Sequence, residues 1–284
     1  MSVIEKAIAI LRNDNSVSKK RNLDNITVGS ISSQAYSTNS NELLCQLDFD
    51  ALGKAGYLTA DNTDTRFAEE FRLLKRPLLI NAFGKGVVPV DMGNLIMITS
   101  SLPGEGKTFT SINLALSMAL ERDTTVLLVD ADVVKPKLST LFGLEKQSGL
   151  IDVLDDSSMS LSDVIVKTDN QKLRIIPAGH VSDHSTEILA SERMRILAEE
   201  LSNRYSDRII IFDAPPFLNT SQAKILASIA GQILVVVEAG VTYSSAIQET
   251  TSQLGNDKVI GMVLNKCKIN KRSAYGGYYG IYGE

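Results

Sequence analysis

The amino-acid sequence predicts a doubly wound α/β domain with a mostly parallel sheet. Short apolar runs recur along the chain, and segments with helical periodicity separate them. A glycine-containing loop directly follows the first run and precedes a helical pattern. Apolar strands that alternate with helices are typical of a parallel sheet covered on both faces. We expect this domain to span residues 66–272, with its strands after residue 77.

The individual elements follow from local patterns. Six runs rich in Ile, Val and Leu are expected to form buried strands, at residues 94–100, 124–130, 172–178, 208–216, 232–239 and 258–266. Helical spacing is present at residues 108–120, 191–205 and 220–230. Residues 66–76 form a further helical pattern, and we expect it to stop before Pro77, because proline disrupts the hydrogen bonds of a helix interior.

Both ends of the chain differ from this pattern. The spacing of apolar residues in 1–12 predicts an amphipathic helix. We expect this helix either to pack on its own domain or to dock on a partner or membrane surface. Residues 13–65 are expected to be a largely irregular linker, rich in Ser and Asn in its first part. Residues 273–284 form a glycine-separated tail with half of the eight tyrosines, Tyr275, Tyr278, Tyr279 and Tyr282. We expect this tail to be flexible.

Composition excludes several classes of protein. The chain has 284 residues, of which 44% are hydrophobic and 22% charged, so it is not a disordered polar chain. A net charge of −4 gives no basic field for nucleic acid. Two cysteines, Cys45 and Cys267, form no disulfide framework, and no apolar run is long enough to span a bilayer. We therefore expect a cytoplasmic protein without a signal peptide.

The segment SLPGEGKT, which ends at Thr108, lies between the first expected strand and a helix. It matches the phosphate-loop pattern G-x-x-x-x-G-K-[ST] except that Ser101 replaces the first glycine. Gly104 and Gly106 allow backbone N–H groups to turn toward phosphates, and the helix N-terminus adds positive charge. Lys107 is expected to reach the β- and γ-phosphates of ATP, and the Thr108 hydroxyl to bind Mg²⁺.

Acidic residues follow two of the expected strands. Asp213 ends the run IIIF, as in a Walker B strand whose carboxylate holds Mg²⁺. Asp130 and Asp132 follow the run VLLV. Because ligands gather at the carboxyl ends of strands in such sheets, we expect these three acids to lie beside the phosphate loop. Two histidines, His180 and His184, have no third metal ligand nearby in the sequence and are expected to lie on the surface.

The phosphate loop, the segment VLLVDADVVKP, the segment IIIFDAPP and the tyrosine-rich tail together resemble the bacterial tyrosine kinases of polysaccharide synthesis. The N-terminal segment, the long linker and DADVVKP are most similar to the exosortase-associated branch (PEP-CTERM). The resemblance implies the ParA/MinD-like P-loop NTPase fold, the cofactors ATP and Mg²⁺, and autophosphorylation of the tail tyrosines. It also implies a cytoplasmic enzyme recruited to the inner face of the membrane by a separate polysaccharide co-polymerase, and a tyrosine phosphatase as a further partner.

The same resemblance assigns site residues. Lys107, Asp130, Asp132 and Asp213 are the implied catalytic residues, and Thr108, Asp130 and Asp213 the implied metal ligands. The ATP-binding residues would be Pro103, Gly104, Glu105, Gly106, Lys107, Thr108 and Phe109. From the chemistry, we expect Asp132 to accept the tyrosine proton and Asp130 to lie near the metal, although the reverse assignment is nearly as well supported.

Two positions depart from the family pattern. Val134 stands where D-x-D-x-R has its arginine, and Lys135 follows one position later without the bidentate geometry of a guanidinium. The E-x-x-R-x-x-R helix, linked to ring assembly, is matched by Glu69, Arg72 and Lys75, again with lysine for the last arginine. A solvated ladder of charges is the alternative explanation of that helix. The implied assembly would let one subunit phosphorylate the tail of its neighbour.

An alternative function is a ParA/MinD-like assembly or positioning ATPase without tyrosine kinase activity. Those proteins carry a second lysine early in the phosphate loop, where this chain has Leu102. They also lack a terminal tyrosine cluster, so the sequence favours the kinase.

Overall fold

The computed structural model describes residues 35–37, 43–84, 86, 89–180, 182–204, 207–255 and 258–267. Its described strands form one sheet in the order β1-β2-β5-β6-β4-β7-β3-β8-β9. The predicted helix 1–12, the first part of the predicted linker and the tail 273–284 lie outside the described residues. Among the helices that are described, none has the length and apolar character needed to cross a membrane.

The six predicted strands form the parallel part of this sheet. They are β3 (Leu95–Ser100), β4 (Thr125–Asp130), β6 (Leu173–Ile176), β7 (Arg208–Asp213), β8 (Gln232–Glu238) and β9 (Val259–Asn265). Neighbouring strands among them all pair in parallel. Because β3 and β7 are buried on both faces, their sequences are continuously apolar rather than alternating. The predicted fold class is confirmed.

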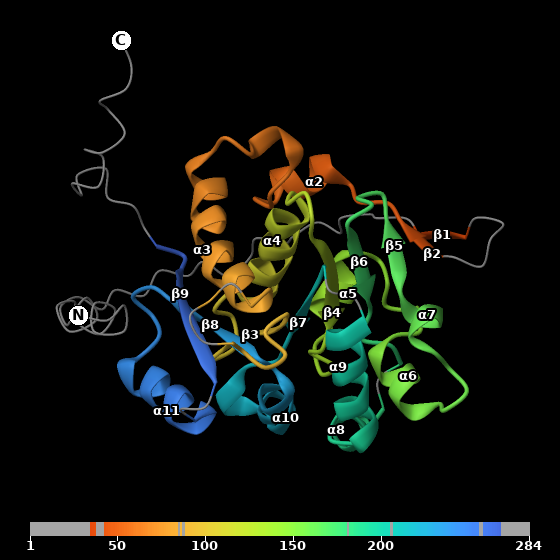
Figure 1. Cartoon of the computed structure of the whole chain (residues 1–284). Helices are drawn as coiled ribbons and strands as arrows, with labels where there is room; N and C mark the ends of the chain where they lie inside the picture. The colour runs from red at the N-terminus through yellow and green to blue at the C-terminus, as the bar shows by residue number, and fades with distance from the viewer. Residues whose placement is uncertain are drawn as a thin grey trace, which may run out of the picture.

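Helices cover both faces of the sheet, as Figure 1 shows. The helices α3 (Arg66–Ala82) and α4 (Lys107–Ala119) pack on one face, where Phe71, Ile112 and Ile211 belong to one apolar cluster. The helices α9 (Glu192–Arg204), α10 (Ser221–Ile229) and α11 (Ser244–Leu254) pack on the other, with Leu197, Leu226 and Phe212 in a second cluster. The shorter helices are α5 (Lys137–Leu141), α6 (Leu150–Asp155), α7 (Leu161–Val164), α8 (Ser185–Leu189) and the 3-10 turn η2 (Phe217–Asn219).

One end of the sheet departs from the parallel pattern. The short strand β5 (Val166–Thr168) pairs antiparallel with β6 and parallel with β2 (Leu43–Cys45), which pairs antiparallel with β1 (Ala35–Ser37). These strands have three residues each. Such short runs give too little periodicity for detection from the sequence.

The prediction that Pro77 ends its helix is wrong, because α3 continues to Ala82. Pro77 lies on the exposed side of α3, whereas its neighbour Leu78 is buried. The carbonyl that Pro77 leaves without an N–H partner is that of Leu73, a residue on the exposed side where water can bind it. Packing of the opposite side of α3 then outweighs the missing hydrogen bond.

The second half of the predicted linker is folded, contrary to expectation. Residues 43–62 contain β2, α2 (Phe49–Lys54) and the 3-10 turn η1 (Ala60–Asn62). Leu52 is 1% exposed and belongs to the α3–α4 apolar cluster. The backbone N–H of Leu58 donates to Asn113 Oδ1 in α4 at 2.7 Å. Scattered apolar residues therefore anchor this segment on α4, although they follow no regular period.

Replacing Leu52 by Ala tests this packing. We expect the variant to lose about 2–5 kcal/mol of unfolding free energy, because it leaves a cavity in the α3–α4 cluster. Urea unfolding followed by circular dichroism measures the change. The exposed Lys54→Ala in the same helix is the matched control, expected within about 0.5 kcal/mol of the parent. Equal stability of the Leu52 variant and the control would show that residues 43–62 do not pack on the domain.

Candidate active site

The phosphate loop joins β3 to α4 at the carboxyl edge of the sheet. Gly104 and Gly106 have φ angles of 90° and 98°, a backbone region that favours glycine. Gly106 is the N-cap of α4, and a side chain there would collide with the amide group of Asn265. The N-terminus of α4 thus opens onto the loop, an arrangement that binds phosphate through backbone N–H groups.

Lys107 and three aspartates lie together at this edge, as predicted. Lys107 Nζ forms an ion pair with Asp132 Oδ2 at 2.5 Å, with both side chains nearly buried. Burial lowers the pKa of Lys107, but the charges of Asp213, Asp132 and Asp130 outweigh it and raise that pKa above its ordinary value. Lys107 is therefore held as a cation facing a cluster of carboxylates.

Asp213, at the end of β7, is 0% exposed. Its Oδ1 accepts a hydrogen bond from Ser111 Oγ at 2.9 Å, while Oδ2 is buried with no hydrogen-bond partner among the described residues. Burial raises the pKa of Asp213, and the charge of Lys107 opposes this rise, as do the nearby hydroxyls of Thr108 and Ser111. A buried carboxylate oxygen without a hydrogen-bond partner is costly, and this cost favours either protonation of Asp213 or ligation of a cation.

Both carboxylate oxygens of Asp130, in contrast, accept hydrogen bonds from other residues of the protein. Its Oδ2 accepts hydrogen bonds from Ser139 N at 2.8 Å and Ser139 Oγ at 2.7 Å, and its Oδ1 accepts from Asp132 N at 3.3 Å. Burial and the charge of Asp213 raise the pKa of Asp130 to about 7, although the Ser139 hydrogen bonds lower it. Asp130 thereby braces the loop that carries Asp132.

Two residues predicted to bind ATP have side chains directed elsewhere. Glu105 is 2% exposed, accepts a hydrogen bond from Leu102 N at 2.7 Å and another from the hydroxyl of Thr242. The ring of Phe109 packs against Tyr57, with centroids 5.0 Å apart, and against Phe67. Glu105 therefore braces the phosphate loop, and Phe109 joins the start of α4 to the segment before α3.

The end of β9 is attached to the phosphate loop. Asn265 Nδ2 donates to Glu105 O at 2.9 Å, and Lys266 Nζ donates to Gly104 O at 2.8 Å. Lys266 also pairs with Glu238 Oε2 at 2.8 Å. The last described residues of the chain thus contact the loop expected to hold phosphates. Sequence reasoning missed these contacts, since nothing in the local pattern of β9 signals them.

The charges of α3 divide into two groups. Glu69 and Arg72 pair with each other at 2.7 Å on the half-exposed side. Lys75 is 5% exposed, donates to Ser117 O at 2.6 Å and pairs with Glu121 at 2.8 Å. Lys75 therefore ties α3 to α4, whereas the Glu69–Arg72 pair lies on the half-exposed side of α3.

The other described positions predicted from the sequence lie outside the cluster of Lys107 and the aspartates. Lys135 is exposed, and its backbone N–H donates to Asp132 Oδ1 at 3.1 Å. His180 Nδ1 lies 2.9 Å from Asp152 Oδ1, and no group of three metal-ligating side chains occurs in the described part of the chain. The four tail tyrosines lie outside the described residues.

Comparison with known proteins agrees with this site. Residues 93–256 match the family described as AAA domain. The chain is 36% identical to tyrosine-protein kinase YwqD of Bacillus subtilis (strain 168), over 65% of this chain and 77% of that protein. It is 33% identical to succinoglycan biosynthesis transport protein ExoP of Rhizobium meliloti (strain 1021), over 78% of this chain and 28% of that protein. The kinase domain of Escherichia coli tyrosine kinase ETK superposes with a TM-score of 0.61 at 26% identity, over 76% of this chain and 83% of that one.

The raised pKa of Asp130 predicts a pH dependence of stability. In the unfolded chain this carboxyl ionises near its ordinary pKa of 3.8, whereas in the folded chain it keeps its proton up to about pH 7. Folding is therefore penalised increasingly as the pH rises from 4 to 7, by on the order of 1 kcal/mol per pH unit. We expect Asp130→Asn to remove this slope in metal-free, nucleotide-free protein, measured by urea unfolding at pH 5, 6, 7 and 8.

The exposed Asp155→Asn serves as the control for that series. It should follow the parent protein at every pH. If Asp130→Asn also follows the parent, the carboxyl of Asp130 ionises normally in the folded protein.

Proposed function

Because the chain belongs to the bacterial tyrosine kinase family, we propose that it transfers the γ-phosphoryl group of ATP to tyrosine hydroxyls of its own tail. The acceptors would be Tyr275, Tyr278, Tyr279 and Tyr282. The observation that supports this most directly is the convergence of Lys107, Asp132 and the unpaired oxygen of Asp213 at the phosphate loop. Phosphoryl transfer requires mainly this kind of positioning and charge neutralisation.

The residues present fit Mg²⁺ and ATP. The backbone N–H groups of the loop from Pro103 to Gly106 and the N-terminus of α4 would hold the phosphates, with Lys107 on the β- and γ-phosphates. Thr108 Oγ1 and Asp213 Oδ2 would supply the hard oxygen ligands that Mg²⁺ prefers, and Asp130 is the third proposed ligand. Bound Mg²⁺ would neutralise the charge of the phosphates during transfer.

Asp132 is the proposed base. Asp132 Oδ2 accepts from the mobile head group of Lys107, whereas the oxygens of Asp130 accept from the backbone and hydroxyl of Ser139 and from the backbone of Asp132. When Lys107 turns to the phosphates, Asp132 is free to accept the proton of a tyrosine hydroxyl. The phenolic oxygen then forms a bond to the γ-phosphorus, the bond to the bridging oxygen breaks, and ADP leaves.

The last described residues before the tail contact this site. Asn265 and Lys266 donate hydrogen bonds to carbonyls of the phosphate loop. We propose that each subunit presents its tyrosines to a neighbour in a ring, with Glu69 and Arg72 on the contact surface. Adding several phosphates, each with about −1.5 to −2 charges, would then weaken the assembly by repulsion.

In the cell, we propose that the enzyme regulates exopolysaccharide synthesis from the cytoplasm. A separate membrane co-polymerase would recruit and activate it at the inner face of the membrane, and a tyrosine phosphatase would reverse the reaction. The similarity to ExoP, a transport protein of succinoglycan biosynthesis of which the chain spans 28%, supports this role. Membership of the exosortase-associated branch remains a proposal based on the N-terminal segment and DADVVKP.

Lys107→Met tests the kinase directly. Purified protein with ATP and Mg²⁺ should acquire phosphate on the tail tyrosines, mapped by mass spectrometry, and the variant should lose at least about 100-fold in rate because the γ-phosphate loses its charge partner. The assay is run with and without the membrane activator. ATP hydrolysis without any phosphotyrosine under both conditions would contradict the proposal and favour an assembly ATPase.

Two further variants complete that experiment. Lys135→Met, an exposed lysine whose backbone contacts Asp132, is the matched lysine control and should keep most of the activity. Asp132→Asn should bind nucleotide normally yet lose transfer by about 100-fold or more. Normal transfer by Asp132→Asn would reassign the base to Asp130.

A further inference from the structure

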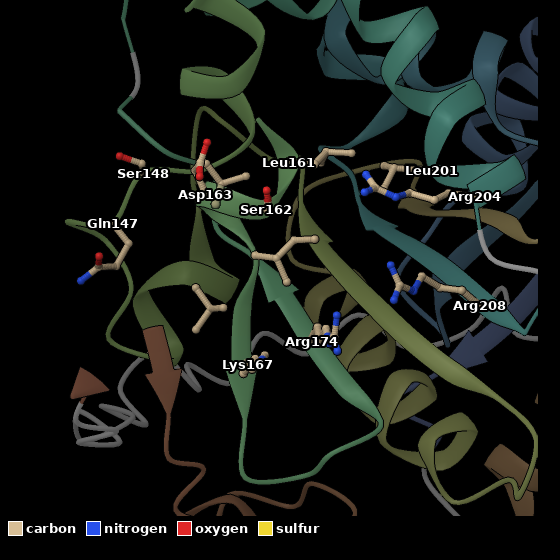
Figure 2. Close-up of a pocket in the computed structure, with 13 residues that line it drawn as sticks. Gln147, Ser148, Leu161, Ser162, Asp163, Lys167, Arg174, Leu201, Arg204 and Arg208 are labelled. Atoms are coloured by element: carbon tan, nitrogen blue, oxygen red, sulfur yellow. The ribbon is translucent and has the colours of Figure 1, made fainter. Parts of the chain in front are cut away.

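The hydroxyl of Tyr57 is a polar group without a partner among the described residues, because no hydrogen bond joins it to any of them. The polar cavity of about 270 Å³ beside α7 and α9 differs in this respect. Its basic residues Lys167, Arg204 and Arg208, which Figure 2 labels, each interact with other groups of the chain. Tyr57 lies in the segment between α2 and α3, which is anchored on α4.

The backbone around Tyr57 is fixed against the first turns of α4. The carbonyl of Tyr57 accepts a hydrogen bond from Asn62 Nδ2 at 2.9 Å. The next N–H along the chain, that of Leu58, donates to Asn113 Oδ1 at 2.7 Å. Asn113 is fully buried, and its Nδ2 donates to Phe109 O at 2.9 Å. One buried amide group therefore joins the backbone next to Tyr57 to the start of α4.

The ring of Tyr57 belongs to an aromatic cluster at the same end of α4. Its centroid lies 5.0 Å from that of Phe109, whose ring also packs on Phe67 with centroids 5.9 Å apart. Phe109 directly follows Thr108, one of the proposed metal ligands. Packing in this cluster requires no hydroxyl, since two of its three members are phenylalanines. The oxygen of Tyr57 is therefore available for a contact with a ligand.

The Tyr57 hydroxyl lies within electrostatic reach of the catalytic cluster. Burial raises the pKa of Tyr57 above its ordinary value, and the negative charge of Asp213 raises it further. Because the interaction between charges weakens with distance, this effect of Asp213 agrees with a hydroxyl near the phosphate loop. A tyrosine with a raised pKa keeps its proton at neutral pH, so the hydroxyl can act as a hydrogen-bond donor.

The hydroxyl of Tyr57 and the carboxylate of Asp213 are not bonded to each other. Asp213 Oδ2 has no hydrogen-bond partner, and Asp213 Oδ1 accepts from Ser111 Oγ. A donor and an acceptor thus remain unpaired near the same loop. A phosphate group carrying Mg²⁺ would satisfy both, because its oxygens accept hydrogen bonds and its metal ion binds carboxylate oxygens.

We propose that the Tyr57 hydroxyl donates a hydrogen bond to the phosphate chain of the bound nucleotide. This inference rests on the proposed function, which places ATP on the phosphate loop. The segment between α2 and α3 then contributes a nucleotide-binding residue in addition to its packing on α4. Since the backbone and ring of Tyr57 are already held by α4, little further ordering is needed when the nucleotide binds.

Tyr57→Phe tests the hydroxyl alone, because the variant keeps the ring that packs on Phe109. The full-length protein is titrated calorimetrically with ADP and with a non-hydrolysable ATP analogue, each in the presence of Mg²⁺. We expect the variant to bind one or both nucleotides at least about fivefold more weakly, since a hydrogen bond to a charged phosphate is lost. Tyr243→Phe, at a tyrosine that is 75% exposed, is the matched control and should bind like the parent.

The outcomes separate this inference from the proposed kinase. The urea midpoint of Tyr57→Phe should equal that of the parent, and a lower midpoint would overturn the inference by assigning the hydroxyl to stability. Parent-like affinity of Tyr57→Phe for both nucleotides would also overturn it, while leaving the kinase proposal intact. If the parent itself bound neither nucleotide, the proposed function would fail together with this inference.

Discussion

The candidate active site depends on the burial of the Asp213 carboxylate. One of its oxygens is held by Ser111, and the other is enclosed without a partner next to the phosphate loop. The nearby cation, Lys107, is already paired with Asp132. This arrangement agrees with the proposal that Mg²⁺ bound to a nucleotide occupies the oxygen-rich corner beside the phosphate loop. Burial also explains why the pKa values of both Asp130 and Asp213 are raised.

The parallel sheet makes this cluster possible. Asp130 and Asp213 are register partners at the ends of β4 and β7, and β3 leads into the phosphate loop on the other side of β7. Hydrogen bonds from other segments support this cluster. Ser139, nine residues along the chain, holds Asp130, while Thr242 holds Glu105 and the end of β9 holds the loop carbonyls from more than 100 residues away. The last described residues of the chain are therefore joined to the phosphate loop.

The sequence was sufficient for the parallel strands and for the central charged residues. Strands buried on both faces give uninterrupted apolar runs, and the spacing of the phosphate loop is short and local. The sequence was insufficient where a single tertiary contact decides whether a residue is buried or whether a helix continues. Pro77 stays within α3 because it faces water, and Leu52 joins the core from a segment without periodicity. Lys75, predicted at a subunit contact, is buried against α4 because Glu121 and Ser117 lie within its reach.

The dependence of ADP binding on Mg²⁺ tests the role of Asp213 most directly. Calorimetric titration of ADP, with and without Mg²⁺, would be made on the parent protein, on Asp213→Asn and on the exposed control Asp155→Asn. If Asp213 holds the metal, Mg²⁺ strengthens ADP binding at least about tenfold in the parent and control, and this gain is lost in Asp213→Asn. An undiminished gain in Asp213→Asn would contradict the account, because the unpaired oxygen would then have no part in binding the metal.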